Sequence, residues 1–391
     1  MACSTATTPV DPRAPVGAAM LALATCLLVG LPADAPAQGQ RQDRTDGAPA
    51  LRIDTIVEPL EHPWSIAFLP DGRQLVTERP GRLRLIDDGV LSAPIDGVPP
   101  VMAESQGGLF DVLLHPDFAR TGELFLSYAH GTADRNAVRV LRARLQGDAL
   151  VEARVIFTAV PWKDTPVHFG GRLALLPDDT LLLSIGDGFD YRESAQRLDS
   201  HLGKLVRLTF DGQAPADNPF IGREGALPEL YSIGHRNPQG LAVDAADGTV
   251  WSHEHGPAGG DEINRIVAGG NYGWPVATTG RDYSGAAISP FSRRDGMIDP
   301  LVEWTPSIAP GGLAIGSGPL FPELDGALLV AALKSRELLQ VPRDALDDGD
   351  RGSLVLDGIG RLRDVRIAPD GALWLSVDAE AGRVVRAVPA N

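Results

Sequence analysis

The chain has few cysteines, few aromatic residues and no excess of positive charge. Its 391 residues include 2 cysteines, and 6% of them are aromatic. Both cysteines, Cys3 and Cys26, lie near the N-terminus, so a chain cleaved after them has no disulfide to stabilise it. The formal net charge is -16 at pH 7, which excludes a general electrostatic attraction to nucleic acid or to an anionic membrane surface.

The motifs of several common enzyme classes are also missing. The sequence has no GxSxG nucleophile motif, no Walker A motif, no Rossmann glycine pattern and no HExxH zinc motif. No stretch has a helical period long enough to alternate with strands, which argues against an α/β barrel. The 44 glycines and 32 prolines instead favour many short strands joined by turns.

Residues 1–38 predict a secretory signal peptide. An apolar run of about 17 residues starts at Val16, at the short limit for a membrane span, and the small-residue patterns ADA and APA follow it. The alternative is an uncleaved membrane anchor. A lipoprotein form is disfavoured because the apolar run continues past Cys26. Cleavage predicts a periplasmic or secreted protein without a membrane span in its mature chain, and residues 39–50 predict a polar linker.

A repeated pattern follows the linker, in which two apolar runs flank a turn such as Pro-Asp-Gly. The clearest copies, at residues 66–78 and 365–378, read IAFLPDGRQLVTE and VRIAPDGALWLSVD, and four related copies start at Leu113, Leu173, Leu241 and Leu313. The spacing of about 47 to 72 residues is the scale on which propeller blades repeat. We therefore predict an all-β chain with a single six-bladed β-propeller over residues 51–391. A β-sandwich with coincidental turns is the alternative.

Loops from all blades of a propeller converge on its axis, so polar segments from distant repeats can form one pocket. His168 lies just before the third hairpin, beside two glycines, and an imidazole there can accept a proton near neutral pH. A histidine that is only hydrogen-bonded within its loop is the alternative. Residues 254–262 could offer carbonyl and carboxylate oxygens to calcium, or they could form a solvated acidic loop.

Four cations come from three repeats of this acidic chain. Arg361 and Arg363 are separated by one residue, and in a strand this spacing points both guanidinium groups to the same side. Together with Arg236 and Lys334 they suit a ligand that has several carboxylates. Any one of them, taken alone, could equally be an ordinary surface cation.

Several motifs occur in a fixed order along residues 53–388. They are His168 with GGRL, GHRNPQGL, EHGPAGGDEIN, GGNYGWP, Lys334 and RLRDV. In these motifs the chain resembles the soluble glucose and aldose sugar dehydrogenases that depend on pyrroloquinoline quinone (PQQ). The resemblance implies oxidation of an aldose sugar at its anomeric carbon to the lactone. It also implies PQQ and Ca²⁺ as cofactors and an unidentified electron acceptor as partner.

The resemblance assigns a role to each matching residue. His168 would be the general base that takes the proton of the anomeric hydroxyl. The other implied contacts are with the quinone (Arg236, Asn237, Lys334, Arg361 and Arg363), with the sugar (Gln106 and Asp261), with a calcium ion through main-chain oxygens (Gly256 and Pro257) and with a second, structural calcium ion (Glu262 and Tyr272).

The chain departs from the glucose enzymes at one position. Val167 stands where those enzymes have an aspartate that helps to hold the sugar, which indicates the branch that oxidises a broader range of aldoses. Two other functions remain open. One is a propeller that binds a sugar or a partner protein without turnover. The other is a calcium-dependent lactonase, which needs a carboxylate-lined metal site at the axis.

Overall fold

The computed structural model describes residues 50–343, 346 and 350–390. The signal peptide predicted at residues 1–38 lies outside these residues, as does the predicted linker except for Ala50. Within the described part of the chain, no helix is both long enough and apolar enough to cross a membrane.

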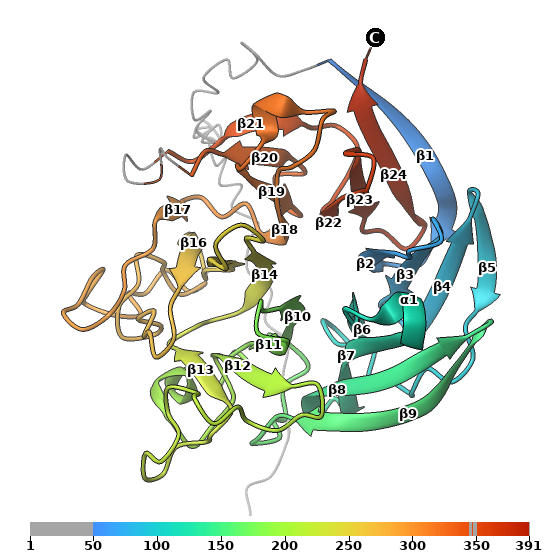
Figure 1. Ribbon diagram of the computed structural model, residues 1–391. Helices are drawn as coiled ribbons and strands as arrows, with labels where there is room; N and C mark the ends of the chain where they lie inside the picture. Colours follow the sequence, from blue (N-terminus) through green and yellow to red (C-terminus); the bar gives the residue numbers. More distant parts are fainter. Residues whose placement is uncertain (1–49, 344–345, 347–349, 391) are drawn as a thin grey trace, which may run out of the picture. The chain divides into compact units, whose positions relative to one another are not determined.

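The described strands form six four-stranded antiparallel sheets arranged around one axis, as Figure 1 shows. The first strand of each sheet contacts the first strands of both neighbouring sheets, so these strands form the closed inner ring. The short helix α1 (Phe118–Thr121) lies between β6 and β7, η1 (Arg192–Gln196) lies between β11 and β12, and η2 (Pro322–Leu324) lies between β18 and β19. The prediction of a six-bladed β-propeller is confirmed, and the sandwich alternative is wrong.

In the first three blades, the strands lie in chain order from the axis outward. Blade 1 contains β2 (Pro63–Phe68), β3 (Gln74–Glu78), β4 (Arg82–Asp87) and β5 (Val90–Pro94). Blade 2 contains β6 (Leu109–Leu114), β7 (Glu123–Thr132), β8 (Arg135–Gln146) and β9 (Ala149–Thr158). Blade 3 contains β10 (Gly170–Leu175), β11 (Thr180–Ile185), β12 (Lys204–Thr209) and β13 (Leu230–Ile233).

The remaining blades have the same order. Blade 4 contains β14 (Pro238–Val243), β15 (Val250–Glu254), β16 (Asp261–Ile266) and β17 (Val302–Trp304). Blade 5 contains β18 (Pro310–Ile315), β19 (Leu328–Ala332), β20 (Leu338–Val341) and β21 (Ser353–Leu356). Blade 6 contains β22 (Leu362–Ile367), β23 (Leu373–Val377), β24 (Gly382–Pro389) and, as its outer strand, β1 (Leu51–Leu60).

The two ends of the described chain close the ring. Strand β1 pairs antiparallel with β24, with Ile53 opposite Ala387, so that the last blade is completed by the first strand (Figure 1). This pairing covers an edge of β24 that would otherwise expose unpaired backbone groups. Each repeat found in the sequence corresponds to the first two strands of a blade. Residues 66–78, for example, span the second half of β2 and all of β3.

The core lies between the blades, and it follows from the alternation of side chains along each strand. In β11, Leu181 and Leu183 pack into a cluster with Val140 of blade 2. Leu182, which points to the other side, packs with Leu241 of blade 4. The apolar repeats therefore supply both faces of every blade with residues that bury against a neighbour, and burial of this kind stabilises the ring without a disulfide.

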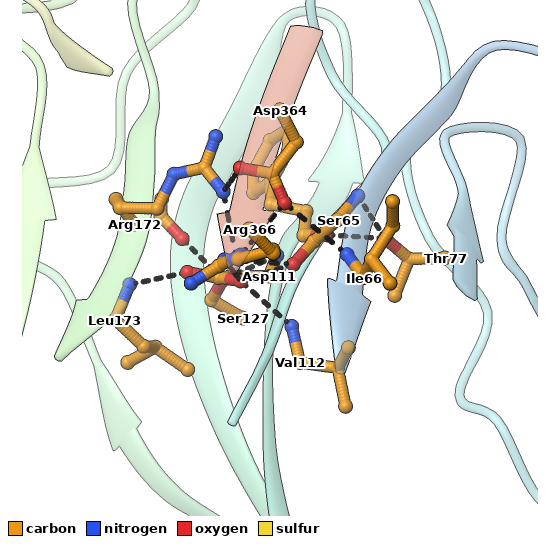
Figure 2. A network of polar contacts seen from close by, with 12 residues as sticks. Ser65, Ile66, Thr77, Asp111, Val112, Ser127, Arg172, Leu173, Asp364 and Arg366 are labelled. Carbon is orange, nitrogen blue, oxygen red and sulfur yellow. Dashed lines mark hydrogen bonds and ion pairs between the residues drawn. The ribbon is translucent and has the colours of Figure 1, made fainter. Parts of the chain in front are cut away.

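A network of charged side chains lies at the axis, as Figure 2 shows. Arg172 of β10 donates to Asp364 of β22 at 3.0 Å. From the same strand as Asp364, Arg366 contacts Asp364 at 2.8 Å and Asp111 of β6 at 3.1 Å. Ser65 of β2 donates to Asp111 at 2.5 Å. Four blades are thus joined by two guanidinium groups and two carboxylates, which neutralise one another; all but Arg366 are almost fully buried.

Candidate active site

A cavity of about 470 Å³ opens at the end of the axial channel where the inner strands begin. Every blade contributes to it, because the residues that precede the six inner strands converge there. Its lining includes, in chain order, His62, Gln106, Phe169, Asn237, Ala309 and Arg361, each from the segment before a different inner strand.

A second hollow, of about 760 Å³, lies where the inner strands end and is lined largely by their aliphatic residues. Arg343 and Arg366, which also line it, are already paired with carboxylates. The two hollows are separated by the axial network, because Arg366 lines one of them and Trp64, which packs against Arg172, lines the other. Four of the site residues predicted from the sequence line the first cavity: Gln106, Asn237, Arg361 and Arg363.

Three arginines give this cavity its positive charge: Arg79, Arg361 and Arg363. Arg363 donates to Gln239 at 2.9 Å and lies 3.5 Å from Asp378. Burial lowers the pKa of Arg363 to about 10, and its Nε atom has no hydrogen-bond partner among the described residues. A buried guanidinium with a free donor is suited to an anionic ligand.

Arg361 and Lys334 are more exposed than Arg363. The side chain of Arg361 is 47% exposed and lies 3.6 Å from Asp378. Lys334 is exposed and directly follows Leu333, which lines the cavity. Although burial of Asp378 acts in the opposite direction, Arg363 and His62 hold the pKa of this carboxyl below its ordinary value. Asp378 therefore neutralises part of the positive charge.

The imidazole of His168 lies beside this cavity, and its orientation is fixed by a buried carboxylate. Its Nδ1 atom donates to Asp187 at 2.7 Å, and its backbone N–H donates to the Gln106 side chain at 2.9 Å. In the neutral ring this arrangement leaves Nε2 as the proton acceptor. Burial lowers the pKa of His168, while Asp187 opposes that effect. The Phe189 ring packs against the imidazole in a T-shaped arrangement, with centroids 5.2 Å apart.

Asp187 is itself held by two further donors. It accepts hydrogen bonds from the backbone N–H of Phe189 at 2.8 Å and from the indole of Trp274 at 2.7 Å. Burial of Asp187 raises its pKa, but the contact with His168, the charge of Arg236 and the hydrogen bond from Phe189 together outweigh burial, and the pKa is lowered overall. The carboxylate is therefore ionised and fixed, as a residue that orients an imidazole needs to be.

Strands β10 and β14 bring Asn237 to the same end of the channel. The side-chain oxygen of Asn237 accepts a hydrogen bond from the backbone N–H of Gly170 at 3.1 Å. Gly170 has φ of 66°, and a Cβ there would lie 2.7 Å from the carbonyl oxygen of Ser184. Only glycine fits this position, and its absence of a side chain allows the close approach of the strands.

The buried carboxylate of Glu254 organises the segment that contains Arg236. Glu254 accepts from His235 at 2.9 Å and from the backbone N–H of Asn237 at 3.3 Å. Arg236 donates to the carbonyl oxygens of His255 at 3.0 Å and Gly256 at 2.6 Å. The predicted calcium oxygen of Gly256 thus already accepts a hydrogen bond from the predicted cofactor residue Arg236.

The other predicted sugar and calcium residues are held mainly by the protein itself. Asp261 accepts from the backbone N–H groups of Gly256 at 2.8 Å and Ala309 at 2.7 Å, and it is not among the residues that line the cavity. The pKa of Asp261 is raised by burial. The carbonyl oxygen of Pro257 lies 3.4 Å from the Ser307 hydroxyl, which donates to it.

At the predicted second calcium position, the Glu262 carboxylate accepts a hydrogen bond from the Asn264 side-chain amide at 2.8 Å. The Tyr272 hydroxyl donates to the Arg265 carbonyl at 2.8 Å and accepts from the Val267 N–H at 2.8 Å. Within the described ranges, no three His, Cys, Asp or Glu side chains are grouped so that they could hold a metal.

The family model for glucose/sorbosone dehydrogenases matches residues 60–386. The chain belongs to this family. It is 40% identical to aldose sugar dehydrogenase YliI of Escherichia coli over 353 residues, which cover 88% of this chain and 95% of the relative. The resemblance found in the sequence motifs, and the expectation of a sugar dehydrogenase, are thereby confirmed.

Solved structures of glucose/sorbosone dehydrogenase relatives have the same fold. A crystal structure titled glucose dehydrogenase is 41% identical, with a TM-score of 0.82 over 86% of this chain and 99% of that chain. The PQQ-bound aldose sugar dehydrogenase of Streptomyces coelicolor is 28% identical, with a TM-score of 0.69 over 87% of this chain and 99% of that chain.

In this member of the glucose/sorbosone dehydrogenase family, sequence reasoning missed several charged residues around the cavity. They include His62, Arg79, Asp187 and Asp378. The repeats contain a signal for two of them, since Asp187 and Asp378 both follow the second strand of a hairpin. Antiparallel pairing places the end of the second strand opposite the start of the inner strand, as Ile185 opposite Gly170 shows. Arg79 and His62 carry no comparable signal in the sequence.

Proposed function

We propose that the chain oxidises aldose sugars at the anomeric carbon to the lactone, with PQQ and Ca²⁺ as cofactors and His168 as the general base. The observation that carries this proposal is a combination at one end of the channel. There, the Asp187 carboxylate orients a buried imidazole at 2.7 Å, and the adjoining cavity is lined by arginines. The match to a PQQ-bound relative supports the choice of cofactor.

The residues around the cavity fit a three-ringed quinone with several carboxylates. A volume of about 470 Å³ is in the range of small-molecule sites. Arg79, Arg361 and Arg363 supply charge for carboxylates, and the unpartnered Nε of Arg363 is a donor that such a ligand would satisfy. When bound, the quinone supplies a two-electron acceptor for the hydride that leaves the anomeric carbon.

The role of His168 follows from its tautomer and its pKa. Because Nδ1 donates to Asp187, Nε2 is the atom that takes the hydroxyl proton as the anomeric C–O bond becomes a carbonyl. Burial lowers the pKa of His168, so the ring is neutral and able to act as a base at neutral pH. Asp187 then stabilises the imidazolium that forms.

The proposed activity requires calcium, and this requirement can be tested. Gly256 and Pro257 offer two main-chain oxygens, fewer than the six to eight oxygens that calcium takes, so these residues alone do not complete a site. The dependence is proposed from the sequence resemblance, as is the second calcium ion at Glu262 and Tyr272. Loss of activity in a chelator, with recovery on addition of calcium but not magnesium, is the expected result.

One experiment tests the central proposal. Purified protein is mixed with PQQ and calcium, dye reduction is followed with a panel of aldoses, and the product is identified by NMR. We expect lactone formation that needs the quinone and is lost in His168→Ala. Full activity in His168→Ala would refute the base, and quinone binding without turnover of any sugar would favour a binding propeller.

The lactonase alternative needs a carboxylate-lined metal site at the axis. Among the described residues, paired charges lie at the axis instead, and arginines line the cavity. We also propose that the protein is periplasmic or secreted after cleavage near residue 38, which N-terminal sequencing of the protein from its host would test.

A further inference from the structure

Lys163 is a buried cation that the proposed reaction does not use. It lies in the loop between β9 and β10 and is 3% exposed. Its ammonium group donates to the carbonyl oxygens of Thr165 and, at 2.9 Å, of Val167. The same group lies 3.6 Å from the centre of the Phe169 ring, within the range of a cation–π contact. Lys163 therefore contacts the residues directly before and directly after His168.

The loop that carries Lys163 is anchored on both sides. The backbone of Lys163 exchanges two hydrogen bonds with Asn136 of β8, at 2.8 and 2.9 Å. Thr165 donates to the carbonyl oxygen of Gly188 at 2.6 Å, next to Asp187. His168 itself has φ of 50°, a left-handed conformation that is unfavourable for a residue other than glycine and persists only where the surroundings enforce it.

We infer that Lys163 is a positioning residue for His168, because its ammonium group holds the Val167 carbonyl and the Phe169 ring on either side of the imidazole and adds a positive charge beside it. The inference rests on the proposed role of His168 as the base.

The charges around the imidazole agree with this geometry. The charged groups that act on His168 are Asp187, Arg236 and Lys163. After burial, which is the largest cause, Arg236 and Lys163 lower the pKa of His168 further while Asp187 raises it. Burial lowers the pKa of Lys163 to about 7, opposed by Asp187 and Asp164. Lys163 is thus still charged over the lower pH range in which the imidazole takes up its proton.

The test measures the titration of His168 directly, by NMR of ¹⁵N-histidine-labelled apo-protein, with the signal assigned as the one missing in His168→Gln. Lys163→Met removes the charge and keeps the apolar stem, and Lys163→Gln is a second neutral variant that keeps a donor. Lys163→Arg keeps the charge. Lys204→Met is the matched control, because Lys204 is also buried and donates to the Ser194 and Leu202 carbonyls at 2.6 and 2.8 Å.

We expect the midpoint of the His168 titration to rise by about one pH unit in both neutral variants, and to stay near the wild-type value in Lys163→Arg and Lys204→Met. The acid limb of kcat/KM in the quinone-loaded enzyme is expected to move in the same direction. An unchanged midpoint in a folded neutral variant would overturn the inference, as would an equal rise in Lys204→Met. Failure of the wild type to oxidise any aldose would instead refute the proposed function, since the NMR titration needs no turnover.

Discussion

Substitution of Arg172 tests whether the axial network stabilises the propeller. Arg172→Met removes the guanidinium group and keeps a side chain of similar length in a site where 2% of the side chain is exposed. The lost contacts are those with Asp364, with the Gln239 carbonyl and with the Gly311 carbonyl, each at 3.0 Å. The variant also loses the packing of the cation 4.0 Å from the centre of the Trp64 ring.

The expected loss of unfolding free energy in Arg172→Met follows from the balance of charge in the network. In the wild type, two guanidinium groups face two carboxylates, whereas in Arg172→Met the same carboxylates of Asp111 and Asp364 share Arg366 alone. Removing one partner of a buried ion pair costs about 3–5 kcal/mol, so we expect the free energy of unfolding to fall by about that amount. A matched control is Arg386→Met, because Arg386 and its partner Asp370 are 24% and 54% exposed and an exposed pair contributes about 1 kcal/mol or less.

Urea denaturation followed by tryptophan fluorescence, at matched pH and salt, gives both free energies. The double variant Arg172→Met/Asp364→Asn restores neutrality. Its free energy of unfolding is therefore expected to fall by less than the sum of the decreases in the two single variants, by about 1 kcal/mol or more. If Arg172→Met were no less stable than Arg386→Met, or if the two single losses simply added, the network would not be the stabilising device that its contacts indicate.

Three further outcomes follow from the same structure. Asp187→Asn removes the carboxylate that orients His168, so kcat is expected to fall about a hundredfold or more, measured with saturating quinone; an unchanged kcat would contradict the orienting role. Arg361→Ala is expected to weaken retention of the quinone about tenfold with little change in the relative kcat/KM among sugars, measured by fluorescence titration and dye reduction, and an equal loss of both would count against its assignment. Burial lowers the pKa of His253 to about 4, so its proton binds more tightly to the unfolded chain. The corresponding stability is therefore present above pH 6.5 and is lost, by up to about 3 kcal/mol, as the pH falls towards 4. His253→Leu is expected to flatten the dependence of unfolding free energy on pH over that window, and an unchanged slope would refute this.

The fold was predictable because each hairpin repeats the same local pattern. An apolar run, a turn and a second apolar run recur six times, and alternation within each run determines which residues face each neighbouring blade. The closure of the ring by β1 was not predictable from this repeated pattern. Residues 51–60 lack the repeated turn, and their pairing with β24 depends on contacts between opposite ends of the chain.

The candidate site was predictable where the chain carries dense motifs. Gln106, Asn237, Arg361 and Arg363 all line the cavity. Asp261, in contrast, has both oxygens engaged by backbone N–H groups, and no pattern in the sequence separates a carboxylate that faces a ligand from one that fixes a loop. The difference depends on the conformations of two segments from different blades, which the spacing of residues does not specify.

The position of the acidic residues within the repeat explains much of what the motifs left out. Glu78 and Glu254 end the second strands of blades 1 and 4, and Asp187 and Asp378 follow the second strands of blades 3 and 6. Antiparallel pairing brings each of these ends to the start of an inner strand, and therefore to the same end of the channel. The same end of the second strand thus supplies four carboxylates, which lie within two residues of one another in the register, and each has a different partner. Glu78 pairs with arginines, Asp187 with an imidazole, Glu254 with backbone N–H groups and an imidazole, and Asp378 with the cations of the cavity. Because the repeat fixes where the carboxylate lies but not what lies opposite, a sequence comparison of the blades can locate such residues, while their chemistry depends on the loop that each blade adds beside them.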